Sequence, residues 1–179
     1  GIKSTFSKLL NKNLVNPKDI VGICNTSQWN GTVAINREGK HLMNAIIWMD
    51  TRGAKYVKKL NDDLLKVDGM SILKALKWVK ITGGAPTLSG KDPISHIMWI
   101  KNERPEIYKK THVFLEPQDF INFKLTGIIA ASYASQHMHW VLDIRDVNNI
   151  HYSNELLQIL DVEKEKLPQD LRWSTDILG

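Results

Sequence analysis

The sequence predicts an α/β fold, with a mixed sheet, flanking helices and a helical addition. Apolar runs of strand length lie in the first third of the chain, whereas later segments repeat apolar residues at helical spacing. Strands followed mostly by helices are typical of a sheet with helices packed on it. The 179 residues, 42% of them apolar, suffice for one domain with a buried core.

The first half of the chain is expected to contain a helix, a strand, a hairpin and two further helices. Their expected positions are 2–12 (helix), 19–25 (buried strand), 31–36 with 42–48 (hairpin), and 52–66 and 71–79 (helices). Asn16-Pro17 should end the first helix, because proline cannot continue it. Glu38-Gly39 supplies turn-forming residues between the two arms of the hairpin.

The second half is expected to be mostly helical. After a loop at 83–93, the expected elements are helices at 94–102 and 105–110, a strand at 112–115, and helices at 117–125 and 153–160. Gly127 stands where a left-handed residue commonly ends a helix. Trp78, Trp99 and Trp140 lie in apolar helical patterns and are predicted to be core residues. An irregular end begins at Pro168.

Composition narrows the class of protein. The net charge is +5, but the lysines are dispersed among acids instead of gathered with aromatic residues, so we do not expect nucleic-acid binding. No apolar run approaches the roughly 20 residues that span a bilayer, and the start lacks the apolar centre of a secretory signal. Cys24 is the single cysteine, which indicates a reducing, cytoplasmic setting. Its place in the run IVGIC predicts a small buried residue.

A polar cluster stands at the ends of two predicted strands. Gln28 and Asn30 offer both donors and acceptors, which suits a polyhydroxylated ligand, and Trp29 could stack on a sugar ring. Asp50 could accept hydroxyl hydrogen bonds, and Arg52 could hold Asp50 or a ligand oxygen. A second interpretation stays open on this chemistry alone, in which the first segment is a polar turn and Asp50 caps the next helix.

Two further motifs, a pair of histidines and a pair of glycines, are interpreted as structural features and not as ligand-binding sites. On a strand, His137 and His139 would share a face, but no third and fourth ligand stands at a spacing typical of metal sites. We therefore predict no metal site there. Gly83-Gly84 lacks the Lys-Ser/Thr of a phosphate-binding loop, so a flexible loop is expected.

With IVGICNTSQWNG, WMDTRG, PEIYKK and FKLTG in this order, the chain resembles the N-terminal lobe of the FGGY carbohydrate kinases, with a xylulose kinase-like character. IVGICNTSQWNGTVAINREGKHLMNAIIWMDTRG is similar to the family's strand, its Gln-centred substrate loop, a hairpin and its Trp-x-Asp-x-Arg motif. HIMWIKNERPEIYKKTHVFLEPQDFINFKLTG resembles its Pro-Glu-x-(Tyr/Phe) helix and Leu-Thr-Gly element. WVLDIRD and KLPQDLRWSTDILG are similar to the end of that lobe.

The resemblance implies a two-lobed enzyme of the ribonuclease H-like fold (actin/hexokinase superfamily). Such a kinase transfers the γ-phosphoryl group of ATP, with Mg²⁺, to a hydroxyl of a ketose or polyol, and a xylulose-like acceptor is favoured. By resemblance, the substrate-binding residues are Gln28, Trp29, Asn30, Asp50 and Arg52. After the glutamine, glycerol kinases carry Arg-Glu and xylulose kinases Met-His, whereas this chain has Trp29-Asn30. The segment 132–137 departs from the family as well.

The resemblance also implies what this chain lacks. The family's phosphate-binding hairpin would precede Gly1, and its catalytic Asp and adenosine-binding glycines would follow Gly179. Residues 1–179 are therefore expected to be a partial N-terminal, acceptor-binding domain without a catalytic residue.

Such a domain should bind neither ATP nor Mg²⁺ and should be inactive alone. Its expected partner is a small-molecule sugar or polyol, not nucleic acid or a membrane, and the full-length form is a candidate homodimer. The alternative is a non-catalytic carbohydrate-binding or interaction module derived from the same lobe.

Overall fold

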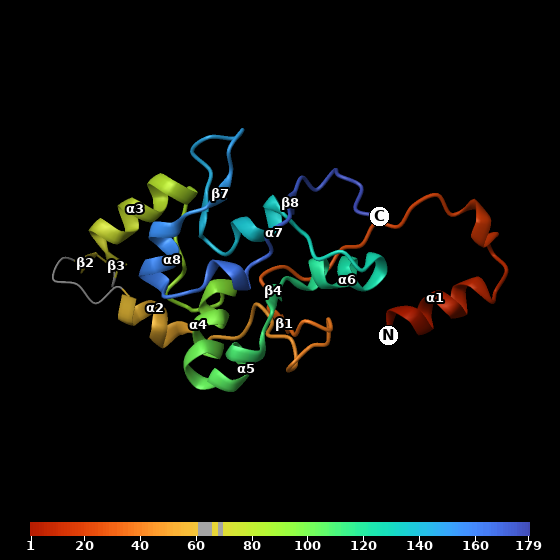
Figure 1. The fold of residues 1–179 in the computed structure, drawn as a ribbon, viewed down its shortest axis with the longest axis horizontal. Coiled ribbons are helices and arrows are strands. Elements are labelled where there is room, and N and C mark those ends of the chain that lie inside the picture. The colour runs from red at the N-terminus through yellow and green to blue at the C-terminus, as the bar shows by residue number, and fades with distance from the viewer. Residues whose placement is uncertain (61–65, 68–69) are drawn as a thin grey trace.

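The computed structural model describes residues 1–60, 66–67 and 70–179, in which short strands and helices alternate (Figure 1). The helices are α1 (Ile2–Leu10), α2 (Ala54–Leu60), α3 (Ile72–Thr82), α4 (Pro93–Glu103), α5 (Pro105–Lys110), α6 (Pro117–Thr126), α7 (Tyr133–His137) and α8 (Asn154–Leu160). The strands are β1 (Val33–Ile35), β2 (Lys66–Val67), β3 (Met70–Ser71), β4 (Val113–Leu115), β5 (Ala131–Ser132), β6 (Leu142–Asp143), β7 (His151–Tyr152) and β8 (Leu171–Arg172). Two 3₁₀ turns lie at Pro17–Asp19 and Lys164–Lys166.

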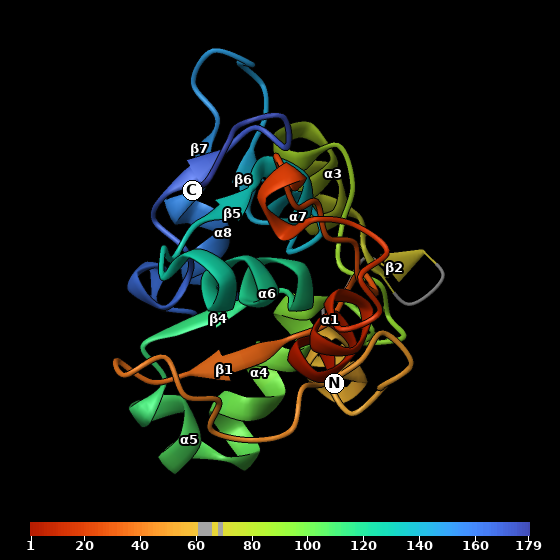
Figure 2. The same ribbon diagram turned by 90° about the vertical axis from the view of Figure 1, so that its right-hand side faces the viewer.

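The described strands form four two-stranded sheets. β1 pairs with β4 in the antiparallel direction, and β5 pairs with β8 in the parallel direction. The remaining pairs, β2 with β3 and β6 with β7, are antiparallel. Figure 2 shows β1 and β4 side by side near the centre, with α6 on one side of them and α4 and α5 on the other. The predicted α/β class with mixed strand directions is confirmed.

The β1–β4 pair is buried on both faces. Successive side chains of a strand point to opposite faces, so alternate residues of each strand enter different clusters. One cluster faces α6 and contains Val33, Ile35, Val113 and Leu115, with Phe120 and Phe123 packed against them. The other is the main core, in which the β-pair residues Ala34 and Phe114 join Ile94, Ile97 and Ile100 of α4. The strand pair therefore connects the two parts of the core.

The predicted hairpin at 31–48 is confirmed, although its second arm is not a regular strand. Thr32 and Ile46 exchange both backbone hydrogen bonds, with N···O distances of 2.9 and 3.0 Å. Ile35 forms an isolated bridge with His41, and Gly39 makes the turn with a left-handed φ of 70°. This arm occupies the edge of β1 that β4 leaves open.

The prediction of a buried strand at 19–25 is wrong. Most of this segment is exposed, the side chain of Val21 lies in solvent, and Cys24 is exposed as well. An apolar run forms a strand only where a neighbouring edge completes its hydrogen bonds. Because β4 and the hairpin arm occupy both edges of β1, the segment has no ladder partner among the described residues.

Most predicted helices are confirmed, together with the residues expected to end them. The helices predicted at 2–12, 71–79, 94–102, 105–110, 117–125 and 153–160 correspond to α1, α3, α4, α5, α6 and α8. Ser71 and Ser153 cap the starts of α3 and α8, each accepting a backbone N–H through its hydroxyl oxygen. Gly127 ends α6 with φ of 79°, in the left-handed region as predicted.

The helix predicted at 52–66 is only partly right. It begins as α2 at Ala54 and ends at Leu60, and Lys66 lies in β2. Leu64 and Leu65, which were expected on its apolar side, fall outside the described residues.

The tryptophans expected in the core are found there. Trp78 and Trp99 are buried, and Trp140 packs against the main cluster while remaining partly exposed. The indole N–H of Trp78 donates to the carbonyl oxygen of Trp140 at 2.9 Å. In the parts of the chain that the structure describes, no helix is both long and apolar enough to cross a membrane.

We expect Gly31→Ala to destabilise the protein by about 1–3 kcal/mol, the usual cost of overpacking. A Cβ at this position would lie 2.4 Å from Cγ of Pro117. Chemical denaturation with urea measures the loss. Gly22→Ala is the matched control, because its Cβ would meet nothing within 4 Å and it should cost no stability. If Gly31→Ala is as stable as the parent chain, the Gly31–Pro117 contact is not tight.

Candidate functional site

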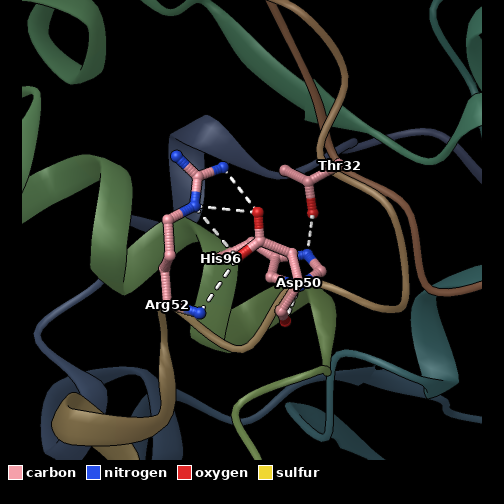
Figure 3. A network of polar contacts seen from close by, with 4 residues as sticks. All are labelled: Thr32, Asp50, Arg52 and His96. Atoms are coloured by element: carbon pink, nitrogen blue, oxygen red, sulfur yellow. Dashed lines mark hydrogen bonds and ion pairs between the residues drawn. The ribbon is translucent and has the colours of Figure 1, made fainter.

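The turn after the hairpin holds Asp50 and Arg52 in an ion pair (Figure 3). Arg52 Nε lies 2.8 Å and Nη2 2.5 Å from Oδ2 of Asp50, and the backbone N–H of Arg52 donates to Oδ1 at 2.9 Å. The guanidinium also lies over the indole of Trp99 on α4, with Cζ 3.8 Å from the ring centroid. Asp50 and Arg52 are thus held in one orientation by each other and by α4.

This geometry excludes the capping role that was considered for Asp50. The helix that follows begins at Ala54, and the Asp50 carboxylate binds the backbone and guanidinium of Arg52. Asp50 is therefore not the cap of α2. The expectation that Arg52 holds Asp50 is confirmed.

A buried histidine connects this turn to the start of β1. His96 Nδ1 lies 3.1 Å from the hydroxyl oxygen of Thr32, and its Nε2 lies 3.4 Å from the backbone carbonyl oxygen of Asp50. Figure 3 shows the imidazole between these two groups. Since the Asp50 carbonyl accepts, Nε2 carries the proton in this arrangement and Nδ1 accepts from Thr32. His96 therefore fixes the distance between the strand and the turn.

Burial and the neighbouring charge have opposite effects on the pKa of Asp50, and the same holds for the pKa of His96. Burial alone would raise the pKa of the Asp50 carboxyl, but the hydrogen bonds and charge of Arg52 outweigh burial and hold this pKa below its usual range. Burial lowers the pKa of His96, against the opposing effect of Asp50. At neutral pH, Asp50 is therefore charged and His96 is neutral.

The polar loop before β1, which includes Gln28, Trp29 and Asn30, differs in exposure from residue to residue. Gln28 is exposed and the Trp29 side chain is 60% exposed, so both present their polar or aromatic groups to solvent. Asn30 is 8% exposed, has a left-handed φ of 55°, and its Oδ1 has no partner among the described residues. The loop thus ends in a buried corner while its preceding residues project outward.

The structure brings part of the predicted site together. Asp50 and Arg52 are in direct contact, and Thr32, which follows the loop by two residues, reaches the Asp50 turn through His96. Within the described chain, no hydrogen bond or ion pair joins Gln28 or Trp29 to Asp50 or Arg52. Their common role in binding an acceptor stays a prediction.

Sequence reasoning missed His96. Its signal in the sequence is a histidine inside the apolar run ISHIMWI, on a helix whose first two turns are entirely buried. A buried polar side chain in such a helix requires a hydrogen-bond partner, and here it finds two. The partners lie 64 and 46 residues away, which the sequence does not reveal.

His137 and His139 were considered as a metal-binding pair on one face of a strand. His137 ends the short helix α7 and His139 is buried two residues later, so the two do not lie on a strand. Burial lowers the pKa of His139 to about 4, which keeps it neutral. Among the described residues, no group of three or more His, Cys, Asp or Glu side chains is placed to hold a metal ion.

Comparison with known proteins identifies the family. Residues 2–179 match the N-terminal domain of the FGGY family of carbohydrate kinases. The chain belongs to this family. The resemblance seen in the ordered motifs, from the Gln28 loop to the final segment, is thereby confirmed.

Named FGGY relatives include xylulose and glycerol kinases. The xylulose kinase of Bacillus subtilis is 28% identical over 178 residues, which are 97% of this chain and 32% of that protein. The xylulose kinase of Staphylococcus xylosus is 28% identical over 84% of this chain and 28% of its own length. A glycerol kinase of Thermococcus gammatolerans is 25% identical over 92% of this chain and 31% of that protein. The chain thus spans about a third of the length of these relatives.

Solved structures of FGGY kinases share the fold. The ligand-bound xylulose kinase of Lactobacillus acidophilus superposes with a TM-score of 0.71 and 23% identity, covering 91% of this chain and 30% of that one. The glycerol kinase of Plasmodium falciparum, with ADP, gives 0.67 and 22% identity over 82% of this chain and 28% of that one. The predicted ribonuclease H-like fold is confirmed.

We expect Arg52→Ala to raise the pKa of Asp50, because only Arg52 opposes the effect of burial strongly. In the parent chain, the lowered pKa of Asp50 adds stability above the pKa of the unfolded state, and this is lost as the pH falls through the folded-state pKa. The free energy of unfolding of Arg52→Ala should therefore change less with pH between the folded-state and unfolded-state pKa values of Asp50. Carboxyl ¹³C NMR titration measures the pKa directly.

Arg145→Ala is the control for this titration. Arg145 pairs with Asp143 in the same two-residue arrangement, and Arg145 is what lowers the pKa of Asp143. The control should raise the pKa of Asp143 and leave that of Asp50 unchanged. An unaltered Asp50 pKa in Arg52→Ala would contradict the proposed ion pair.

Proposed function

We propose that this chain is the acceptor-binding part of a carbohydrate kinase that transfers the γ-phosphoryl group of ATP to a hydroxyl of a ketose or polyol. A xylulose-like acceptor is favoured. The observation that carries the proposal is the family match over residues 2–179. Similarity to xylulose kinases over 97% and 84% of the chain supports the choice of acceptor class.

The exposed loop and the rigid turn have complementary chemistry for a sugar. Gln28 can both donate to and accept from hydroxyl groups, and the exposed face of Trp29 can cover the apolar side of a carbon chain. Asp50 keeps acceptor capacity beyond its bonds to Arg52, so it can also accept a hydroxyl hydrogen bond. We infer that these residues, with Asn30, bind and orient the acceptor.

Orientation is the contribution that such residues make to phosphoryl transfer. In this chemistry, catalysis depends chiefly on positioning and on stabilising charge, and a carboxylate takes the acceptor proton. Because Arg52 and the indole of Trp99 restrain the turn before any ligand binds, little side-chain entropy would be lost on binding.

The described residues offer no cluster that fits Mg²⁺. We therefore assign no step through the metal or ATP to this chain. We infer that both, and the catalytic base, are held by residues beyond the partial N-terminal domain at 1–179, which would make the domain inactive alone. We infer that the full-length enzyme is cytoplasmic and acts on a small molecule. It is also a candidate homodimer.

A ligand panel on the intact enzyme tests the proposed function. At 100 times its dissociation constant, the true acceptor should stabilise the protein by about 2.7 kcal/mol, which a thermal-shift assay detects. D-xylulose, glycerol and D-gluconate, each with and without ATP, form the panel. We expect D-xylulose to bind and be phosphorylated by the intact enzyme and not by the 179-residue chain. Binding without phosphorylation by the intact enzyme would favour a non-catalytic module, and phosphorylation by the short chain would contradict its inactivity.

Gln28→Ala in the intact enzyme should lower kcat/KM for the acceptor by roughly tenfold, since a hydrogen bond to a ligand is worth about 0.5–1.5 kcal/mol or more. Gln28 is exposed, so the protein should lose no stability. Gln158, an exposed glutamine on α8, provides the matched control, and Gln158→Ala should retain the parent kinetics. Unchanged kinetics in Gln28→Ala would remove this residue from the site.

A further inference from the structure

A buried carboxyl group holds the loop that leads into α4. Asp92 directly precedes this helix and is 3% exposed. Its Oδ2 accepts from the backbone N–H of Thr87 at 2.6 Å and from the Thr87 hydroxyl at 2.8 Å, and its Oδ1 accepts from the indole N–H of Trp140 at 3.0 Å. The backbone N–H of Gly90 donates to the carbonyl oxygen of Thr87, which closes the loop turn (residues 87–90). Asp92 therefore fixes the loop turn relative to α4 and to Trp140.

The side chain of Asp92 binds the loop and not the helix that it precedes. An aspartate in this position commonly accepts a backbone N–H of the first helical turn. Here the backbone carbonyl oxygen of Asp92 accepts from the N–H groups of Ser95 and His96, at 2.9 and 3.2 Å, and within the described helix the side chain makes no capping bond. A carboxyl group is costly to bury without hydrogen-bond donors, so its three donors favour a single position of the loop turn.

The loop turn packs against the residues that directly follow Arg52. A Cβ on Gly90 would lie 2.1 Å from the backbone nitrogen of Ala54 and 2.5 Å from the carbonyl carbon of Gly53. A Cβ on Gly53 would itself lie 2.6 Å from the carbonyl oxygen of Ser95 in α4. Gly53 is buried, so the loop turn and α4 enclose it. Moving the loop turn would therefore move the backbone directly after Arg52.

The same loop also contacts the chain before the Asp50–Arg52 ion pair. Lys91 follows the loop turn, and its ammonium nitrogen lies 5.4 Å from the centroid of the Trp48 indole, within the range of a cation–π contact. Trp48 precedes Asp50 by two residues, whereas the glycine contact lies after Arg52. The loop thus restrains the chain on both sides of the ion pair that Figure 3 shows.

We propose that Asp92 is a positioning residue for the candidate site. Its carboxyl group holds the loop turn against Gly53, and the loop turn fixes the orientation of Asp50 and Arg52. The inference rests on the proposed function only in taking the Asp50–Arg52 pair to bind the acceptor. The hold of Asp92 on that pair can be measured without any acceptor.

Replacing Asp92 with asparagine removes this hold while changing the size of the side chain little. Asp92 accepts hydrogen bonds on both of its oxygens, whereas an amide has one oxygen and one NH₂ group. In Asp92→Asn, the NH₂ group must face a donor, either the N–H of Thr87 or the indole N–H of Trp140. A buried donor left unpaired is destabilising, so the loop turn should move away from its position in the parent chain.

NMR of the intact enzyme labelled with ¹⁵N-arginine tests this hold directly. The Nε–H of Arg52 donates to Asp50, and the guanidinium lies over the indole of Trp99, so the chemical shift of this N–H reports the orientation of the pair. Arg52→Lys assigns the signal. Asp92→Asn should shift it, and Thr87→Val, which removes one of the three donors, should shift it less and in the same direction. Thr87→Ser keeps the hydroxyl and should return the signal to its parent position.

Two control variants separate this effect from a general loss of stability. Thr126→Val removes a hydroxyl that donates to the carbonyl oxygen of Asn122 at 2.9 Å, at the end of α6. Asp143→Asn alters a carboxyl group that is 7% exposed and that pairs with Arg145. Each control should lower the stability to urea, because it loses a hydrogen bond, but should leave the Arg52 signal in place.

The outcomes separate positioning from a purely structural role. A carboxyl group that only stabilised the loop would affect unfolding and leave the Arg52 signal unmoved. The proposal is overturned if Asp92→Asn leaves this signal at its parent position, or if the two controls shift it as far. Should Asp92→Asn fail to fold, the comparison of Thr87→Val with Thr87→Ser decides, and identical Arg52 signals in these two variants also overturn the proposal.

Kinetics with D-xylulose in the intact enzyme form the second arm. We expect Asp92→Asn to raise KM for the acceptor by roughly threefold and to lower kcat/KM by roughly tenfold, with KM for ATP unchanged, because misplaced binding groups weaken acceptor binding and alignment. Simple loss of folded enzyme would lower kcat and leave both KM values unchanged.

The two arms also distinguish this proposal from the proposed function. An Arg52 signal that depends on Asp92, in an enzyme that does not phosphorylate D-xylulose, would support the positioning of the pair and count against the xylulose-like acceptor. Parent kinetics in Asp92→Asn, in an enzyme that does phosphorylate D-xylulose, would overturn the positioning role.

Discussion

The antiparallel pairing of β1 with β4 is the interaction on which the rest of the structure depends. It is three residues long, yet both of its faces are buried, one against α6 and the other in the main core. One end of the pair places Gly31, which follows the loop corner at Asn30, against Pro117. Displacing this pair by one residue would turn each core side chain to the opposite face, so the packing fixes the register.

The polar groups near this pair transmit its position to the candidate site. Thr32, at the start of β1, binds His96, and His96 binds the backbone of Asp50. Each such buried hydrogen bond contributes about 0.5–1.5 kcal/mol net, but leaving one partner unsatisfied costs about 1–3 kcal/mol. The arrangement therefore favours one distance between strand and turn over others. Arg52, whose guanidinium lies over the buried indole of Trp99, also restrains the turn.

The sequence predicts local structure well because the relevant signals are local. Helical periodicity and glycine at the expected end located α6, and the Asp50–Arg52 contact joins residues two apart. The segment at 19–25 was mispredicted because a strand depends on whether a distant edge is free. His96 was missed for the same reason, since its importance comes from partners brought close only by folding.

The left-handed corner at Asn30 and the close packing of Gly31 divide the polar loop into two parts with different freedom to evolve. Gly31 has no room for a side chain, and Asn30 must tolerate a backbone that few residues accept. Gln28 and Trp29 touch little of the core, so substitutions there change the exposed chemistry at small cost to folding. With the acceptor-binding role that we propose for Gln28 and Trp29, divergence in substrate preference can begin at these two positions without a compensating change in the scaffold.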